Sequence, residues 1–283
     1  MRTLITTLCV ALLLLTANSH AAEQPKYILF FGNSFTGAKD LKTVGGVDGI
    51  PGLVQEIAVA AGLPRPMTQR SISGGKTLKW HIENSTRAIA KPNRLTGVPK
   101  RSEMPEGFQW DHAVFQEQSS GPSTAGGRGN TSIDRFFATA IELSRQVRAH
   151  SPKARIVLYE TWAYSPQHSW YPDTLPNPQE FQKQLRDNYS EAGELIRLDG
   201  IDAVVAPCGD VWEALKFPIS FYTGDKKHPS AEGALLNGLI LFRTIYQRNT
   251  SNIELGSLAK RLKITADRLM ELQAAADKVT IEN

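Results

Sequence analysis

Two short stretches near opposite ends of the chain contain residues suited to nucleophilic chemistry. Residues 28–37 read ILFFGNSFTG, an apolar run that stops just before Ser34. Near the other end, YTGDKKHPSAEG places Asp225 three residues before His228. A hydrolytic serine needs a base to take its proton, and the base needs a carboxylate that fixes its tautomer. Ser34, His228 and Asp225 are therefore candidates for a nucleophile, a general base and the acid that orients the base.

Neither stretch is specific when it is considered alone. Small residues and Asx residues end strands in many proteins, so Gly32-Asn33-Ser34 also fits an ordinary turn. An Asp and a His three positions apart occur by chance. The two stretches gain weight from their places in the fold, one directly after the first strand and the other on the last loop before a final set of helices.

The elements that position these residues follow from the pattern of apolar side chains. Five short, nearly all-apolar segments are typical of buried strands: 27–31, 67–72, 112–115, 155–159 and 201–206. Longer stretches with helical spacing separate and follow them: 50–61, 77–90, 132–150, 178–198, 230–246 and 255–278, the last as one or two helices. This alternation predicts a five-stranded parallel sheet covered on both faces. We expect a single doubly wound, three-layer α/β/α domain over residues 23–283.

Residues that could bind a developing negative charge also follow the predicted strands. Ligands of open parallel sheets bind outside the carboxyl ends of the strands. The backbone amide of Ser34, the amide of Gly74 or Gly75, and the side-chain NH2 of Gln116 or Gln118 would meet at that edge. Together they could form an oxyanion hole, although SGG also fits a tight turn and FQEQSS a polar strand exit.

The ordered set GNSFT, SGG, FQEQSS and DKKHPS resembles the SGNH (GDSL-type) serine hydrolases. More narrowly, it is similar to a branch of secreted bacterial members with GNSFT, LQEQS and TWAY-like segments. The resemblance covers the chain from Gly32 to Gly233, and its first and last motifs are the specific ones. It implies a flavodoxin-like fold, no metal and no other cofactor, and ester hydrolysis through an acyl-serine.

The resemblance also implies roles for individual residues. Ser34 would be the nucleophile, His228 the general base, Asp225 its partner, and Gly75 (or Gly74) the second oxyanion donor. Two departures from the family pattern stand out. Asn33 occupies a place where the family has an Asp. Gln116 or Gln118 must replace an Asn, and a Gln in this motif occurs in carbohydrate acetylesterases, which favours an acetylated carbohydrate as substrate.

Aromatic residues after the fourth predicted strand support a carbohydrate ligand. Trp162 and the loop 163–178, which contains His168, could form a wall on which a sugar ring stacks. The same aromatic residues could instead pack the loop onto the body. The alternatives to a carbohydrate esterase are a binding protein of the same fold that has lost turnover, and a lipase or thioesterase of the SGNH type.

The N-terminus and the overall composition place further limits on function. Residues 1–22 combine Arg2, the apolar run LITTLCVALLLL and a small-residue Ala21-Ala22, which is typical of a cleavable signal peptide and predicts a secreted or periplasmic protein without a membrane span. Cleavage would remove Arg2 and change the formal charge from +4 to +3. Cys208 would then remain alone, so no intramolecular disulfide could form.

Other classes of partner find little support. The basic stretch 91–101 is interrupted by Pro and Gly and lacks aromatic residues, so it predicts a solvated loop and not a nucleic-acid contact. The histidines show no HExxH pairing or similar metal-binding spacing, which argues against a zinc enzyme. GGKT lacks the first glycine of a phosphate-binding loop. The oligomeric state has no sequence signal.

Overall fold

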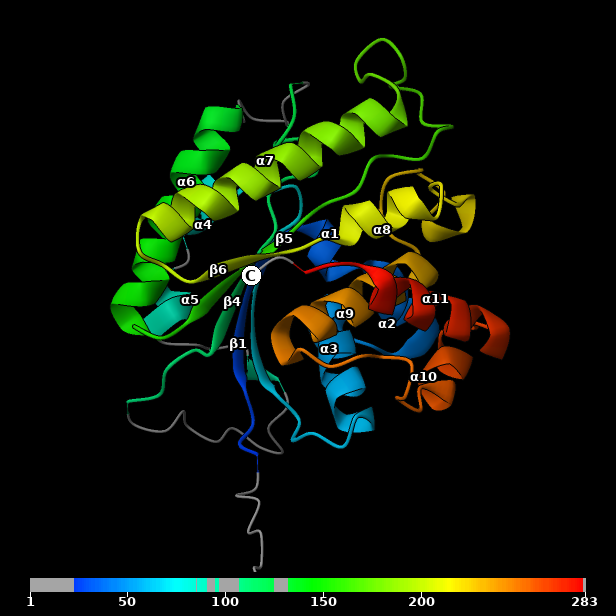
Figure 1. Cartoon of the computed structure of the whole chain (residues 1–283), viewed down its shortest axis with the longest axis horizontal. Coiled ribbons are helices and arrows are strands. Elements are labelled where there is room, and N and C mark those ends of the chain that lie inside the picture. The colour runs from blue at the N-terminus through cyan, green and yellow to red at the C-terminus, as the bar shows by residue number, and fades with distance from the viewer. Residues whose placement is uncertain (1–22, 85, 91–94, 97–106, 125–131, 282–283) are drawn as a thin grey trace, which may run out of the picture.

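The computed structural model describes residues 23–281, apart from 85, 91–94, 97–106 and 125–131. The predicted signal peptide lies outside these residues, as does most of the basic stretch 91–101. The described residues form one sheet with helices on both of its faces (Figure 1).

The sheet contains the five predicted parallel strands and one short addition. Its order is β3-β2-β1-β4-β5-β6, and only β3 is antiparallel within the described residues. The strands are β1 (Tyr27–Gly32), β2 (Met67–Ile72), β3 (Leu95–Thr96), β4 (His112–Phe115), β5 (Arg155–Tyr159) and β6 (Ala203–Ala206). Without the two-residue edge strand β3, the order is that of the doubly wound flavodoxin-like fold, which confirms the predicted class.

The strands are apolar throughout because both faces of the sheet are covered. Along β1, Ile28 and Phe30 face one hydrophobic cluster, whereas Leu29 and Phe31 face the other. All four side chains are fully buried. The period of two in a strand places successive side chains on opposite faces, so one continuous apolar run supplies both halves of the core.

Helices from different parts of the chain build the two outer layers (Figure 1). One cluster joins the sheet to α2 (Lys39–Gly45), α3 (Gly49–Ala60), α8 (Cys208–Ala214), α9 (Ala231–Tyr246), α10 (Gly256–Arg261) and α11 (Ala266–Lys278). The opposite cluster involves α4 (Leu78–Asn84), α5 (Thr86–Ala90), α6 (Ile133–His150) and much of α7 (Pro178–Leu198). The helix predicted at 77–90 is thus described as two shorter helices, and α2 and α8 were not predicted.

Polar side chains define where the long helices begin. Ser132, Asn177 and Ser230 each accept a hydrogen bond from a backbone N–H three residues further on, at the first turns of α6, α7 and α9. Such caps satisfy N–H groups that have no partner inside the helix. These contacts explain why the observed starts lie within one residue of the predicted ones.

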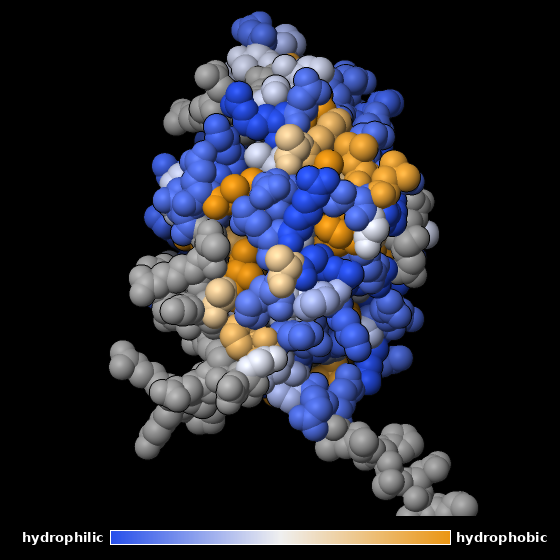
Figure 2. Space-filling view, turned by 90° about the vertical axis from the view of Figure 1, so that its left-hand side faces the viewer, coloured by the Kyte–Doolittle hydropathy of each residue, from blue (hydrophilic) through white to orange (hydrophobic). Residues whose placement is uncertain are grey.

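Polar residues dominate the outside of the helical layer that contains α5 and α6. Figure 2 looks onto this side and shows a mostly hydrophilic surface with hydrophobic residues between the polar ones. Amphipathic helices produce such a surface, because their apolar stripes face the sheet. Among the described residues, no helix combines the length and the apolar character that crossing a membrane would need.

Candidate active site

Ser34 lies at the sharp turn between β1 and the short helix α1 (Ser34–Gly37). Asn33 caps this helix, because its Oδ1 accepts a hydrogen bond from the N–H of Phe35 at 3.0 Å. Ser34 is the first helical residue, so its own N–H has no partner inside the helix. The turn also requires Gly32, because a Cβ there would collide with the Thr36 hydroxyl and with the side-chain oxygen Oε1 of Gln116. The hydroxyl of Ser34 is therefore presented by a closely packed turn at the carboxyl end of β1.

The structure brings Ser34, His228 and Asp225 into one hydrogen-bonded chain. His228 Nε2 lies 2.8 Å from Ser34 Oγ, and His228 Nδ1 lies 2.5 Å from Asp225 Oδ2. A carboxylate only accepts hydrogen bonds, so Nδ1 carries the proton and the free Nε2 accepts from the serine hydroxyl. This is the arrangement in which an imidazole can take a proton from a serine.

The loop that carries His228 is organised around the carboxylate of Asp225. Besides the imidazole, Asp225 Oδ1 accepts hydrogen bonds from the N–H of His228 at 3.0 Å, the N–H of Lys227 at 3.2 Å and the hydroxyl of Thr223 at 2.9 Å. Partial burial opposes ionisation, but these donors and the His228 ring outweigh it and hold the pKa of Asp225 well below its usual range. Asp225 is therefore ionised at neutral pH, as an orienting acid must be.

A small cavity of about 110 Å³ opens beside the serine and the histidine. It is lined by Asn33, Ser34, Phe35, Gly75, Gln118, Ser119, Tyr164, Trp170, Lys227 and His228. Sites for drug-sized ligands usually occupy about 300–1,000 Å³. The cavity beside Ser34 is thus suited to a group of a few heavy atoms.

Of the residues predicted to bind an oxyanion, Gly75 and Gln118 line this cavity together with Ser34. Gly75 lies in a tight turn closed by the hydrogen bond from Lys76 N to Ser73 O at 3.2 Å. Its φ of +69° falls in the left-handed region, which glycine adopts without the cost that a Cβ imposes. The side-chain NH2 of Gln118 donates to Ser119 Oγ at 3.0 Å. Gly74 is not among the residues that line the cavity.

Gln116 was the other glutamine predicted as an oxyanion donor, and its position does not fit that role. Its side chain is fully buried beneath the turn that carries Ser34, residues 32–36. Its Oε1 accepts hydrogen bonds from Asn33 N at 3.0 Å, Thr36 N at 3.3 Å and Thr36 Oγ1 at 2.8 Å, and its NH2 donates to the carbonyl oxygen of Glu117. Gln116 therefore fixes the turn that presents Ser34, and it does not face the cavity.

Trp162 was predicted to contact substrate, but its side chain is fully buried and cannot stack on a ligand. Its indole is stacked between Phe35, at 4.6 Å, and Trp212, at 4.4 Å between ring centroids. Its Nε1 donates a hydrogen bond to the carbonyl oxygen of Lys227 at 3.1 Å. Phe35 in turn contacts the His228 imidazole edge-on at 5.2 Å. Trp162 thus packs against the turn that carries Ser34, through Phe35, and holds the loop that carries His228, through the carbonyl oxygen of Lys227.

His168 lies behind the wall of the cavity and not on it. Its ring contacts Tyr164 at 4.7 Å and Trp170 at 5.4 Å, and its Nδ1 accepts a hydrogen bond from the N–H of Trp170 at 3.2 Å. Tyr164 and Trp170 line the cavity themselves. The loop 163–178 therefore places Tyr164 and Trp170 at the cavity instead of His168, and Trp170 is the less buried of the two.

Phe35 and Glu117 have important contacts in this site that sequence reasoning did not assign. Both stand inside motifs that were singled out, GNSFT and FQEQSS. Phe35 follows the serine and packs against His228. Glu117 separates the two glutamines and is 1% exposed. In the sequence, each residue stands next to a candidate residue, Phe35 after Ser34 and Glu117 between Gln116 and Gln118. The residues that they contact come from other parts of the chain, so only the structure identifies them.

The amide of Asn33 connects the turn that carries Ser34 to the loop of Gly75. Its Nδ2 donates a hydrogen bond to the carbonyl oxygen of Lys76 at 3.0 Å, while its Oδ1 caps α1. An aspartate could form the cap but has no hydrogen to donate to a carbonyl oxygen. The asparagine at this place therefore makes a contact that the acid of the family pattern could not make.

We expect Asn33→Asp to lower kcat/KM for a small ester by about tenfold, because the Gly75 loop loses its tie and a carboxylate then faces a carbonyl oxygen. Steady-state kinetics on an acetyl ester at neutral pH measures the change. A matched control is Asn84→Asp, since the amide of Asn84 also donates to a backbone carbonyl, that of Trp80 at 2.9 Å, but on the exposed side of α4. Equal kinetics for Asn33→Asp and wild type would show that the tie has no effect on the site.

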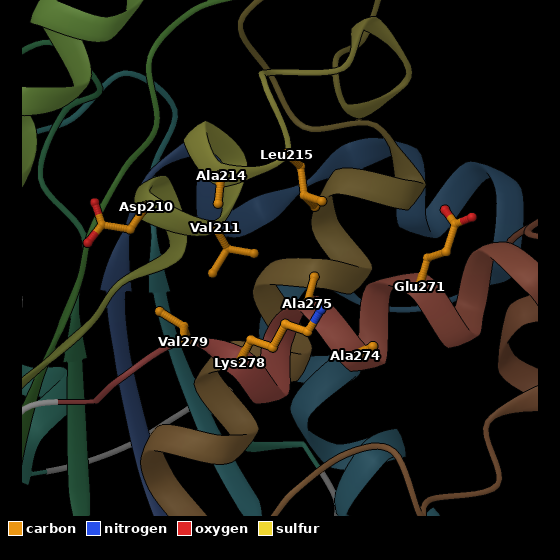
Figure 3. A pocket seen from close by; sticks show the side chains of 9 residues that line it. All are labelled: Asp210, Val211, Ala214, Leu215, Glu271, Ala274, Ala275, Lys278 and Val279. Carbon is orange, nitrogen blue, oxygen red and sulfur yellow. The ribbon is translucent and has the colours of Figure 1, made fainter.

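A larger cavity of about 500 Å³ lies away from the serine, between α8 and α11 (Figure 3). It is lined by Asp210, Val211, Ala214, Leu215, Glu271, Ala274, Ala275, Lys278 and Val279, which include no serine, cysteine or histidine. Its two carboxylates are paired elsewhere, Asp210 with Arg186 at 2.5 Å and Glu271 with Arg268 at 2.6 Å. Its size alone does not make it a reaction site, so we place the candidate active site at Ser34.

Solved structures with similar folds are known, although no family model matches the sequence and no curated protein is detectably similar to it. A DUF4886 family protein from Bacteroides uniformis aligns with a TM-score of 0.63 and 19% identity, over 91% of this chain and 98% of its own. A candidate SGNH hydrolase from Slackia heliotrinireducens aligns with a TM-score of 0.56 and 20% identity, over 78% of this chain and 100% of its own.

A third similar structure is a candidate GDSL-like lipase from Parabacteroides merdae, with a TM-score of 0.54 and 15% identity, over 80% of this chain and 97% of its own. At such identities the likeness concerns the fold. It agrees with the resemblance that the motifs GNSFT and DKKHPS indicated. The chain has the fold of the SGNH, or GDSL-type, hydrolases.

Proposed function

We propose that the protein is a secreted serine esterase that hydrolyses a short-chain acyl ester through an acyl-serine intermediate. The observation that supports this proposal most strongly is the 2.8 Å hydrogen bond between Ser34 Oγ and His228 Nε2, with Asp225 on the other ring nitrogen. Secretion is proposed from the charge, apolar core and small residues of 1–22.

The geometry supports a two-step reaction. Ser34 Oγ attacks the ester carbonyl carbon while His228 Nε2 takes the hydroxyl proton, and the imidazolium is stabilised by Asp225. The carbonyl oxygen, now negative, accepts hydrogen bonds from the N–H groups of Ser34 and Gly75 and from the side-chain NH2 of Gln118. The tetrahedral intermediate then expels the alcohol, which receives the proton from His228. Water, activated by the same imidazole, hydrolyses the acyl-serine and regenerates the hydroxyl.

Two features of the cavity favour an O-acetylated carbohydrate as the substrate class. A volume of about 110 Å³ holds an acetyl group but leaves no room for a long acyl chain. Trp170 is only half-buried and provides aromatic surface beside the serine, and such surface stacks on the apolar face of a sugar ring. The acyl group and the alcohol would then be recognised by different walls of one site.

Covalent capture separates an esterase from a protein of the same fold that only binds carbohydrate. A serine-reactive fluorophosphonate should label the wild-type protein at Ser34, because the neighbouring imidazole activates this hydroxyl. Peptide mapping of the labelled protein identifies the site. Absence of labelling, with binding of an acetylated oligosaccharide intact, would favour the binding protein.

The size of the cavity predicts the preferred acyl chain length. On p-nitrophenyl esters from acetyl to octanoyl, we expect kcat/KM for acetyl to exceed that for octanoyl by about tenfold or more, because each methylene that cannot enter the cavity loses its burial. The same protein should release acetate from acetylated polysaccharides. A preference for octanoyl would contradict the short-chain proposal and support a lipase.

A further inference from the structure

Glu117 is a buried carboxylate that joins two loops of the active site. It follows β4 between Gln116 and Gln118, and it is 1% exposed. Its Oε1 accepts a hydrogen bond from the backbone N–H of Gln118 at 2.5 Å. Its Oε2 accepts one from the backbone N–H of Leu78 at 3.0 Å. Both oxygens therefore bind backbone amides, and the amides belong to different segments.

The two segments are those that carry the oxyanion donors other than Ser34 itself. Leu78 is the first residue of α4, three positions after Gly75, and the turn before it is closed by the bond from Lys76 N to Ser73 O. Gln118 lines the cavity beside Gly75. One side chain thus sets the distance between the loop of Gly75 and the loop of Gln118.

We propose that Glu117 is a positioning residue for the oxyanion hole, and that the hole keeps its geometry only while the Glu117 carboxylate is deprotonated. This inference rests on the proposed esterase activity. A carboxylate can accept from both N–H groups at once with two charged oxygens, whereas protonation takes up a lone pair on one oxygen and leaves that oxygen a much weaker acceptor. Protonation would therefore weaken the hydrogen bond that holds one of the two loops.

The surroundings of Glu117 shift its pKa into the physiological range. Burial raises the pKa of Glu117 to about 7, and the hydrogen bonds from the N–H groups of Gln118 and Leu78 oppose that rise. The carboxylate thus predominates above about pH 7 and the neutral acid below it. The paired hydrogen bonds from Gln118 and Leu78 are therefore weakened as the pH falls.

Three other titratable groups lie near Glu117 in the described residues: Tyr189, His81 and Glu160, a buried carboxylate at the end of β5 whose pKa burial, followed by the charge of Asp210, raises well above its usual range. From α7, the Tyr189 hydroxyl accepts a hydrogen bond from the N–H of Glu117 at 3.3 Å. Burial, followed by the charge of Glu117, raises the pKa of Tyr189 well above its usual range. On α4, burial lowers the pKa of His81 to about 4, and its Nε2 contacts the carbonyl oxygen of Gly32 at 3.0 Å. Tyr189 and His81 therefore do not change charge near pH 7, and of the two buried carboxylates only Glu117 binds the N–H groups of Leu78 and Gln118.

The pH dependence of kcat/KM tests the inference. The proposed reaction already needs His228 in its unprotonated form. If His228 is the only group that must be deprotonated, kcat/KM falls about tenfold for each pH unit on the acid side of the profile. If Glu117 must be deprotonated as well, kcat/KM falls about a hundredfold per unit. We expect the wild-type loss to steepen toward a hundredfold per unit. Glu117→Gln, which has one acceptor oxygen and no proton to gain, should show the tenfold loss only.

Glu117→Asp is the matched variant, because it keeps an ionisable group with a shorter reach. We expect it to be less active at about pH 8 but to retain the steep acid limb. A tenfold loss per unit in the wild type, or an unchanged steep limb in Glu117→Gln, would overturn the inference. The wild-type profile needs no variant, so poor folding of Glu117→Gln would not leave the question open.

Fluorophosphonate labelling distinguishes failure of this inference from failure of the proposed function. If Ser34 is labelled and acetyl ester is hydrolysed, but the acid limb is shallow, only the role of Glu117 is wrong. If Ser34→Ala retains the hydrolysis, the proposed function itself is wrong. Activity should return fully after incubation at acid pH and transfer to about pH 8, because protonation of Glu117 is reversible.

Discussion

Replacing Ser34 by alanine is expected to lower kcat/KM for an acetyl ester by about 10⁴-fold or more, because no acyl-enzyme can form. His228→Ala should have a loss of similar size, since the 2.8 Å contact to the serine hydroxyl is the route by which its proton leaves. The double variant should lose little more than either single one, because the two residues act as a unit. Steady-state kinetics on p-nitrophenyl acetate measures all three.

Ser190→Ala provides the control for these variants. Ser190 is exposed on α7 and does not line the cavity beside Ser34, so its replacement should leave kcat/KM unchanged. Circular dichroism should show that Ser34→Ala unfolds at the wild-type temperature, because a hydroxyl at the cavity is exchanged for a hydrogen. Full activity in Ser34→Ala and His228→Ala would mean that another group carries the reaction.

Trp162→Ala is expected to destabilise the protein by about 3–5 kcal/mol, the usual cost of removing a buried Trp from a core. The indole is fully buried between Phe35 and Trp212, so its loss leaves a cavity under the turn that carries Ser34. It also removes the hydrogen bond to the carbonyl oxygen of Lys227, next to His228. Urea denaturation measures the free energy of unfolding.

Trp170→Ala is the matched variant for Trp162→Ala, because Trp170 is half-buried and lines the cavity. We expect a small change in stability and a raised KM for acetylated oligosaccharides, with little change for p-nitrophenyl acetate, which offers no sugar ring to stack. The opposite pattern, with Trp162→Ala affecting only KM, would return Trp162 to the role of a substrate contact.

The strands could be located from sequence because burial on both faces makes them nearly all-apolar. The bounds of β2, β4 and β5 coincide with the predicted 67–72, 112–115 and 155–159. The long helices α6, α7 and α9 could also be predicted, because each begins at a capping residue and has a long apolar stripe. Short helices that lack a side-chain cap, such as α8, give too few periodic positions to be recognised.

The sequence identified residues that lie in or near the candidate site, but it could not predict which way their side chains point. Gln116 and Gln118 follow the same strand, and local pattern cannot say that one turns under the serine and the other toward the cavity. Trp162 likewise follows β5 at the correct edge, but its neighbours Phe35 and Trp212 come from distant segments and enclose it. Which side chain reaches solvent depends on contacts between segments, and these are absent from any single stretch of sequence.

The hydrogen bond between Ser34 and His228 joins residues 194 positions apart. The serine follows the first strand, and the histidine precedes α9, which packs against α3 from the first part of the chain. A chain that is still emerging from the ribosome, or passing through a pore, therefore carries the serine without its base. The proposed hydrolysis would need the segment that carries His228 to have folded against the first strand, so the appearance of labelling by a fluorophosphonate would report the completion of folding in real time.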